Sequence, residues 1–211
     1  SDFGNSFTWK GAGRFKAMDN RLSLRASMST GFRAPSLHQI YMSNIQTLIS
    51  GGTVSNQGTF NNHSPVIRSL GVDKLKEENA TNTTFGVALK PMDGLDLSLD
   101  VYNVAVDDRI VYSSAIASGD TTSAVGAILN DYNVTSIKFF TNAVSSTTSG
   151  IDFVASYSGL ELGPGSLDLS IGFNTNSTEL DDKITTPDPI SSSGADIFDR
   201  KEQSRLVSAR P

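Results

Sequence analysis

The side chains with the greatest potential for chemistry are two histidines and three adjacent acidic pairs. His38 and His63 are the only imidazoles, and a zinc site would need further donors that their spacing does not suggest. An acidic pair could act as general acid and base or bind calcium. Neighbours in an extended chain point apart, however, and each pair falls at the end of an expected strand. We therefore expect polar loop histidines, solvated acidic residues and no metal site. The pairs are Glu77–Glu78, Asp107–Asp108 and Asp181–Asp182.

The sequence lacks the short motifs that mark common enzyme sites. It contains no Gly-x-Ser-x-Gly, no phosphate-binding Gly-Lys-Ser/Thr loop and no dinucleotide fingerprint. It has no cysteine, which excludes a disulfide framework and a thiolate nucleophile. Its net charge of -5 disfavours a nucleic-acid partner, which usually meets a basic face. We predict a protein that is not an enzyme, uses no cofactor and binds no nucleic acid.

Residues 21–35 show the clearest periodicity in the chain. The even positions from Leu22 to Phe32 are mostly apolar, whereas the odd positions hold Arg21, Arg25, serines and a glycine. Because strand side chains alternate between two faces, this segment predicts a long strand with one apolar and one polar face. A helix would spread both kinds around its surface. The length approaches the roughly nine to eleven residues that a tilted strand needs to cross a bilayer.

Similar alternation predicts about seven strands in all. Besides residues 21–35, they are expected at 7–16, 83–90, 95–112, 151–157, 167–174 and near Leu206. Asp, Asn and Gly tolerate the backbone angles of tight hairpins, so short turns are expected at 18–20, 91–94 and 163–165. Polar segments near 36–80, 113–144 and 175–202 predict long loops. Short and long connections alternate, which predicts an all-β, antiparallel, up-and-down meander with turns at one end and loops at the other.

This arrangement is typical of a partial transmembrane β-barrel, with short turns on one side of the membrane and long loops on the other. No apolar run is long enough for a transmembrane helix. If the apolar faces meet lipid, the opposite faces line a wet interior, because a charge at the lipid midplane costs about 2–4 kcal/mol. The predicted interior charges are Lys10, Arg14, Arg21, Arg25, Lys90, Asp96, Asp100, Asp152 and Asp168. The alternative is a soluble β-sandwich with the leucines in an ordinary core.

Four segments resemble motifs of TonB-dependent outer-membrane receptors, in the order expected for that family. They are Gly-Phe-Arg-Ala-Pro at 31–35, Leu75 to Asn82 ahead of Phe85, Leu99 to Asn103 followed by residues 107–110, and Asn142 with Gly150 to Asp152. The resemblance implies a Gram-negative outer-membrane receptor that takes up a scarce solute, such as a siderophore, cobalamin or glycan. It implies partnership with the TonB complex and outer-membrane lipid. It also implies a plug domain docked on the polar wall.

We expect residues 1–211 to be one piece of a single β-barrel domain, without the plug, the energy-coupling box or the aromatic C-terminal strand of the family. The long loops are expected to supply the substrate surface, although the sequence selects no individual contact residues. Two other classes stay open: a passive porin or adhesin barrel, and a soluble β-sandwich that binds glycans. A barrel piece has two open edges and an exposed apolar face, which predicts self-association of the isolated chain.

Overall fold

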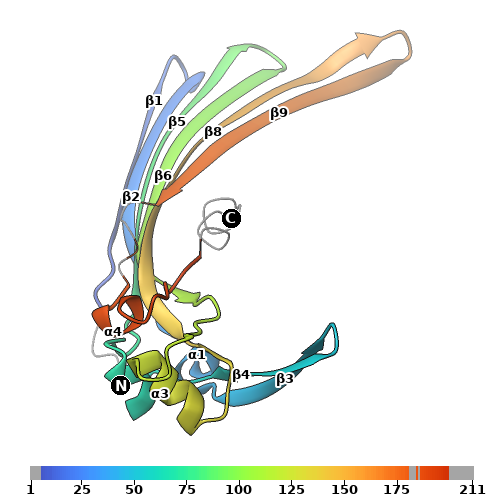
Figure 1. Ribbon diagram of the computed structural model, residues 1–211. Helices are drawn as coiled ribbons and strands as arrows, with labels where there is room; N and C mark the ends of the chain where they lie inside the picture. Colours follow the sequence, from blue (N-terminus) through green and yellow to red (C-terminus); the bar gives the residue numbers. More distant parts are fainter. Residues whose placement is uncertain (1–5, 181–183, 185, 200–211) are drawn as a thin grey trace.

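Six strands form one curved antiparallel sheet, shown in Figure 1. The computed structural model describes residues 6–180, 184 and 186–199. The strand order is β1-β2-β5-β6-β8-β9, so each strand pairs with the next one of the sheet along the chain and the predicted meander is confirmed. The strands are β1 (Lys10–Ala17), β2 (Leu22–Arg33), β5 (Glu78–Met92), β6 (Leu95–Tyr112), β8 (Phe140–Leu162) and β9 (Gly165–Leu180). The strand predicted near Leu206 lies outside the described residues.

The connections have the predicted sidedness. The three tight turns lie together at one end of the sheet, and the long connections with their helices lie at the other (Figure 1). Met18, Asp19 and Asn20 all have positive φ in the first turn, as do Gly94 and Gly163 in the other two. These residue types accept the left-handed conformation at low cost, Met18 excepted. The turns therefore follow from local chemistry except at Met18, whose carbonyl accepts a hydrogen bond from the Arg21 amide within the turn, at 2.9 Å.

Two strands extend further into the predicted loops than their hydropathy indicates. β8 begins at Phe140 and β9 ends at Leu180, while 113–144 and 175–202 were expected to be irregular. The added segments are rich in Ser and Thr on both faces, so no apolar alternation marks them. Threonine nevertheless favours strands, and cross-strand hydroxyl pairs form, such as Thr148 with Thr178 at 2.8 Å. The ladder thus continues beyond the apolar part of the sheet.

The long connections are folded, and the prediction that they lack regular structure is wrong. Serine caps explain where the helices begin: Ser36 forms a capping box with Gln39, and Ser64 and Ser123 accept from backbone N–H groups. None of the described helices is long and apolar enough to span a membrane. The elements are α1 (Leu37–Tyr41), β3 (Asn44–Ser50), β4 (Thr53–Thr59), α2 (Pro65–Ser69), α3 (Ala124–Asp131), β7 (Ser136–Lys138) and α4 (Asp188–Ser191).

The main apolar core lies among these connections and not under the sheet. Its buried side chains come from all three long segments, which therefore pack into one unit at the end of the sheet. Strands β3, β4 and β7 form a small separate sheet in the same region. The core residues are Phe60, Ile67, Leu70, Val72, Ile116, Val125, Ile128, Leu129, Val134, Ile137, Phe139, Ile190, Ile197 and Phe198.

One face of the six-stranded sheet carries a continuous apolar belt. Three successive rows of paired residues run across all six strands in register, and nearly every position in them is apolar. Among the described residues no second layer covers this face, and Phe173 and Ile171 remain 62% and 67% exposed. The alternative of a soluble sandwich is therefore wrong. The rows are Ala17–Leu22–Leu89–Leu97–Ala155–Ile171, Phe15–Leu24–Val87–Leu99–Phe153–Phe173 and Gly13–Ala26–Phe85–Val101–Ile151–Thr175.

We expect the 211-residue chain to self-associate when it is prepared alone without detergent. The apolar belt is uncovered, and β1 and β9 each present one edge that is unpaired in the described part of the chain. Both features drive association of strands and of apolar surfaces. Size-exclusion chromatography with light scattering should show oligomers that detergent disperses. A clean monomer in plain buffer would contradict this expectation.

Candidate functional site

The polar face of the sheet gathers most of the predicted interior charges into cross-strand contacts. Arg25 on β2 pairs with Asp100 on β6, reaching across β5. Gly86 lies between them, and a Cβ at this position would overlap both side chains. Lys90 pairs with Asp96 at 2.7 Å. The glycine thus allows long side chains to lie flat along the wall.

The other predicted interior residues lie on the same face but have different partners. Arg14 donates to Ser23, and Asp152 accepts from Asn174. Asp168 accepts from the Gly159 amide. Arg21 contacts Asp93 in the second turn at 3.4 Å. Lys10 is exposed at the start of β1. The sheet is therefore apolar on one face and ionic on the other, as the alternation predicted.

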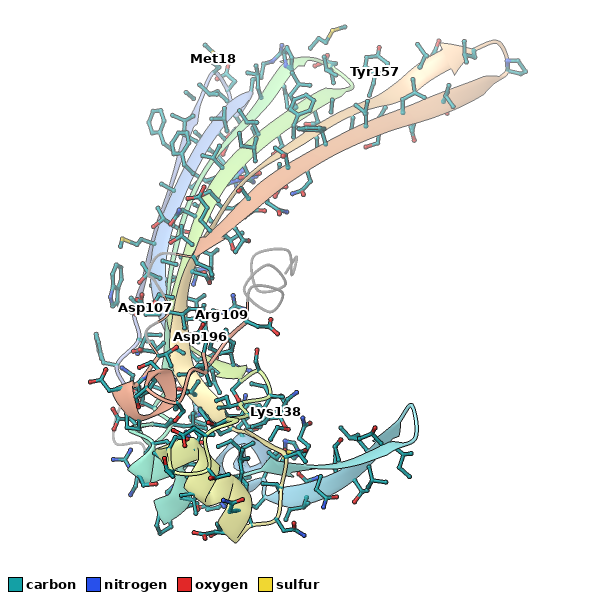
Figure 2. The ribbon with its side chains drawn as sticks, viewed as in Figure 1. Met18, Asp107, Arg109, Lys138, Tyr157 and Asp196 are labelled. Atoms are coloured by element: carbon teal, nitrogen blue, oxygen red, sulfur yellow. The ribbon has the colours of Figure 1, made fainter. Side chains whose placement is uncertain are left out.

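A β-bulge interrupts this alternation near the loop end of β6. The register shifts between Val106 and Arg109, and Asp108 has a φ of 56°. Without the bulge Arg109 would share the parity of Leu99 and point to the apolar side. Instead its guanidinium donates to Ser146 Oγ at 3.0 Å on the polar face, and Figure 2 shows Arg109 and Asp107 on opposite sides of the sheet. Bulges commonly re-aim side chains in this way.

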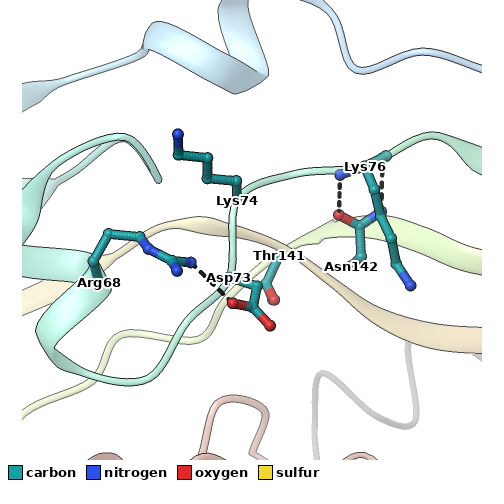
Figure 3. A pocket seen from close by; sticks show the side chains of 6 residues that line it. All are labelled: Arg68, Asp73, Lys74, Lys76, Thr141 and Asn142. Carbon is teal, nitrogen blue, oxygen red and sulfur yellow. Dashed lines mark hydrogen bonds and ion pairs between the residues drawn. The ribbon is translucent and has the colours of Figure 1, made fainter. Parts of the chain in front are cut away.

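The backbone groups freed by the bulge are satisfied by two side chains from other strands. The Ile110 amide donates to Glu78 at 2.6 Å, and the Asp108 carbonyl accepts from Asn142 at 2.6 Å. Asn142 also bonds both the amide and the carbonyl of Lys76, each at 2.9 Å (Figure 3). The motif residue Asn142 therefore ties the approach to β5 to the bulge.

Glu78 is the most constrained carboxylate of this region. Arg33 donates two hydrogen bonds to it, both at 2.6 Å, and its side chain is only 10% exposed. Burial alone would raise the pKa of this carboxyl, but hydrogen bonds from Arg33 and the Ile110 amide hold the pKa below its ordinary value. The residue lies at the loop end of the sheet, beyond the apolar belt. The expectation that it is a solvated charge is wrong, because the bulge supplies a buried donor that the sequence does not reveal.

The remaining chemical candidates lie apart from one another. Glu77 accepts from Ser6, and Asp108 pairs with Lys76 at 2.8 Å. His38 lies edge-on to Phe140, while His63 stacks on Tyr41. In the described part of the chain no three His, Cys, Asp or Glu side chains are placed to hold a metal ion. The pair Asp181–Asp182 lies outside the described residues.

Hollows of different character lie beside the bulge. The hollow shown in Figure 3, about 450 Å³, is lined by Arg68, Asp73, Lys74, Lys76, Thr141 and Asn142. Two of its three cations are already paired: Arg68 with Asp73, and Lys76 with Asp108. Its polar groups mainly join loop segments to each other.

The second hollow, about 580 Å³, lies on the polar face and is called here the Arg109 hollow. Valine side chains and Ile110 form its apolar part, and hydroxyls and two arginines form its polar part. This combination of apolar lining and few directed polar groups is typical of small-molecule sites. The lining residues are Arg33, Glu78, Tyr102, Val104, Val106, Arg109, Ile110, Ser146, Thr148 and Thr178. The sequence did not indicate Arg109 as a residue of the polar face. Strict alternation along β6 assigns it to the apolar face, because the alternation takes no account of the bulge.

Residues 1–199 match the family described as "TonB dependent receptor-like, beta-barrel". Solved structures of similar fold include the RagAB peptide importer, with 13% identity over 88% of this chain and 19% of that chain and a TM-score of 0.57. The siderophore receptor PirA from Pseudomonas aeruginosa shows 16% identity over 85% of this chain and 31% of that chain, with a TM-score of 0.53. No curated protein matches the sequence. The chain thus spans less than a third of the length of either structure.

We expect Glu78→Gln to lower the free energy of unfolding of the folded barrel at neutral pH by about 1.5–3 kcal/mol, since hydrogen bonds to a charged group are lost. Because the folded-state pKa is lowered, this contribution is complete above about pH 4.3, the ordinary glutamate value. It disappears as the pH falls through the lowered pKa. Denaturant unfolding at several pH values measures the effect.

The matched control is Glu77→Gln, which changes the neighbouring carboxylate that accepts from the Ser6 hydroxyl. Its effect should stay within about 0.5 kcal/mol, as at most surface sites. Equal losses for the two variants, or a gap between wild type and Glu78→Gln that persists at low pH, would contradict the role assigned to Glu78.

Proposed function

Because the chain belongs to the TonB-dependent receptor β-barrel family, we propose that it forms part of the barrel wall of an outer-membrane receptor for a scarce solute. The solute would be of the siderophore, cobalamin or glycan type, and the TonB complex would supply the energy. Residues 1–211 would be one piece of a single barrel domain whose plug lies elsewhere in the full protein. The folded loops would face the outside and contribute to the solute surface.

The observation that carries this proposal is the apolar belt. Its three rows leave large side chains exposed over the width of the sheet, while the opposite face holds the ion pairs. In water such a belt would be an aggregation hazard, whereas in a bilayer it is the surface that lipid requires. The belt is three cross-strand rows wide on one face of the sheet, and ladders of polar residues continue beyond it towards the loops.

The polar face of the sheet is consistent with the proposal that a plug domain docks on it. Arg25, Asp100 and their neighbours present hydrogen-bonding groups on the side of the sheet that carries the Arg109 hollow. A passive porin or adhesin barrel is the alternative. It would share the wall and lack the plug and the coupling to the TonB complex.

The substitutions Leu24→Arg and Leu97→Arg in the full-length protein should block its assembly in the outer membrane. Each places a cation in the apolar belt, at a cost of about 2–4 kcal/mol near the lipid midplane. The matched control Ser27→Arg introduces the same side chain on the polar face of β2 and should assemble. Membrane fractionation, together with the gel mobility of unheated protein, reports assembly. Normal assembly of both leucine variants would contradict a lipid-facing belt.

Solute uptake by cells that produce the full-length protein separates the receptor from a passive barrel. We expect uptake at low solute concentration to disappear when the TonB complex is deleted, because transport against a gradient needs an energy source. Uptake that is unchanged by the deletion would favour the porin alternative. Membrane fractionation checks that the protein assembles equally in both strains.

A further inference from the structure

The Arg109 hollow carries more positive than negative charge. Two guanidinium groups line it, from Arg33 and Arg109, but only one carboxylate, from Glu78. Arg33 uses two hydrogen bonds on that carboxylate. Arg109 forms no ion pair in the described part of the chain, and its hydrogen bond there goes to the neutral Ser146 hydroxyl. The described lining residues therefore carry two positive charges and one negative charge, and the two guanidinium groups share the Glu78 carboxylate, Arg33 by hydrogen bonds and Arg109 at longer range.

The position of this charge follows from the bulge and is not a consequence of ordinary strand alternation. The bulge turns Arg109 from the apolar side to the polar side, and Glu78 and Asn142 stabilise the distorted backbone. Strands β5 and β8 flank β6 at this point. Among the described residues of these strands, Glu78 on β5 is close enough to attract Arg109 electrostatically, but Arg33 already occupies both of its oxygens.

The surroundings define the kind of ligand. A guanidinium presents a planar fork of donors that matches a carboxylate. Val104 and Val106 contribute apolar lining to the hollow, and Ser146 and Thr148 contribute hydroxyls. A volume of about 580 Å³ is in the range of sites for small organic molecules.

We propose that Arg109 binds a carboxylate of the transported solute, so that the solute is an organic anion whose hydrocarbon part contacts Val104 and Val106. This inference rests on the proposed function and narrows it: it favours an acidic solute over a neutral glycan. Glu78 and Arg33 act as positioning residues, because they fix the bulge that aims Arg109.

Citrate is a suitable probe, since it carries three carboxylates and is small enough for the hollow. Isothermal titration calorimetry on the full-length protein, folded in detergent at low ionic strength, should detect citrate binding and no binding of its neutral trimethyl ester. Arg109→Gln should weaken citrate binding about tenfold or more, as expected when a charge-assisted hydrogen bond is lost. Arg109→Lys keeps the positive charge but lacks the planar pair of donors. Its affinity for citrate should lie between those of the wild type and Arg109→Gln.

The control Lys138→Gln removes a cation that lies over the Tyr112 ring, outside the Arg109 hollow. It should bind citrate like the wild type. Gel mobility of unheated protein verifies that each variant is folded. Absence of citrate binding to the wild type, or equal binding by folded Arg109→Gln, would overturn the inference. If TonB-dependent uptake persisted despite either result, the proposed receptor function would stand without a carboxylate site at Arg109.

Discussion

Cross-strand register is the constraint on which the rest of this structure depends. Side chains alternate with a period of two, so a slip of one residue in any strand moves all its side chains to the other face. In the observed register Leu24, Val87 and Leu99 share one row, and Arg25 and Asp100 share the next. A slip would place these charges in the apolar belt and break the lateral ion pair. The tight turns fix the register because each admits only a few backbone geometries.

The bulge on β6 is a local exception that the surrounding strands support. It frees a backbone donor and a backbone acceptor, which would be costly if they stayed unpaired. Glu78 takes the donor and Asn142 takes the acceptor, and these side chains come from two different strands. Asn142 also binds the backbone of Lys76, so the loop before β5 is held to β8. The same distortion thus joins three strands and turns Arg109 towards the polar face.

The sheet and the loops are stabilised in different ways. The sheet relies on its hydrogen-bonded ladders and on a belt whose apolar face has no protein layer over it in the described residues. The loops have an ordinary buried core, in which Ile67, Ile116 and Ile197 from three separate segments are at most 2% exposed. The loop unit can therefore present a defined surface, unlike a set of independent flexible loops. The β3–β4 hairpin extends from this unit, as Figure 1 shows.

The sequence by itself determined the strand faces, the tight turns and the sidedness of the connections, because each depends on residues close together in the chain. Alternation from Leu22 to Phe32 specifies two faces wherever that strand lies, and the residues at 18–20 and 91–94 specify turns. Local motifs also gave the resemblance to TonB-dependent receptors, which the match of residues 1–199 to that family confirms.

Only the tertiary structure decided the loop core, the burial of Glu78 and the direction of Arg109. The core residues are far apart in the sequence and show no common period, so no local pattern marks them as partners. Glu77 and Glu78 are identical in type, and one is buried only because Arg33 and the Ile110 amide converge on it. The bulge that turns Arg109 is set by pairing between β6 and its neighbouring strands, which the local sequence does not contain.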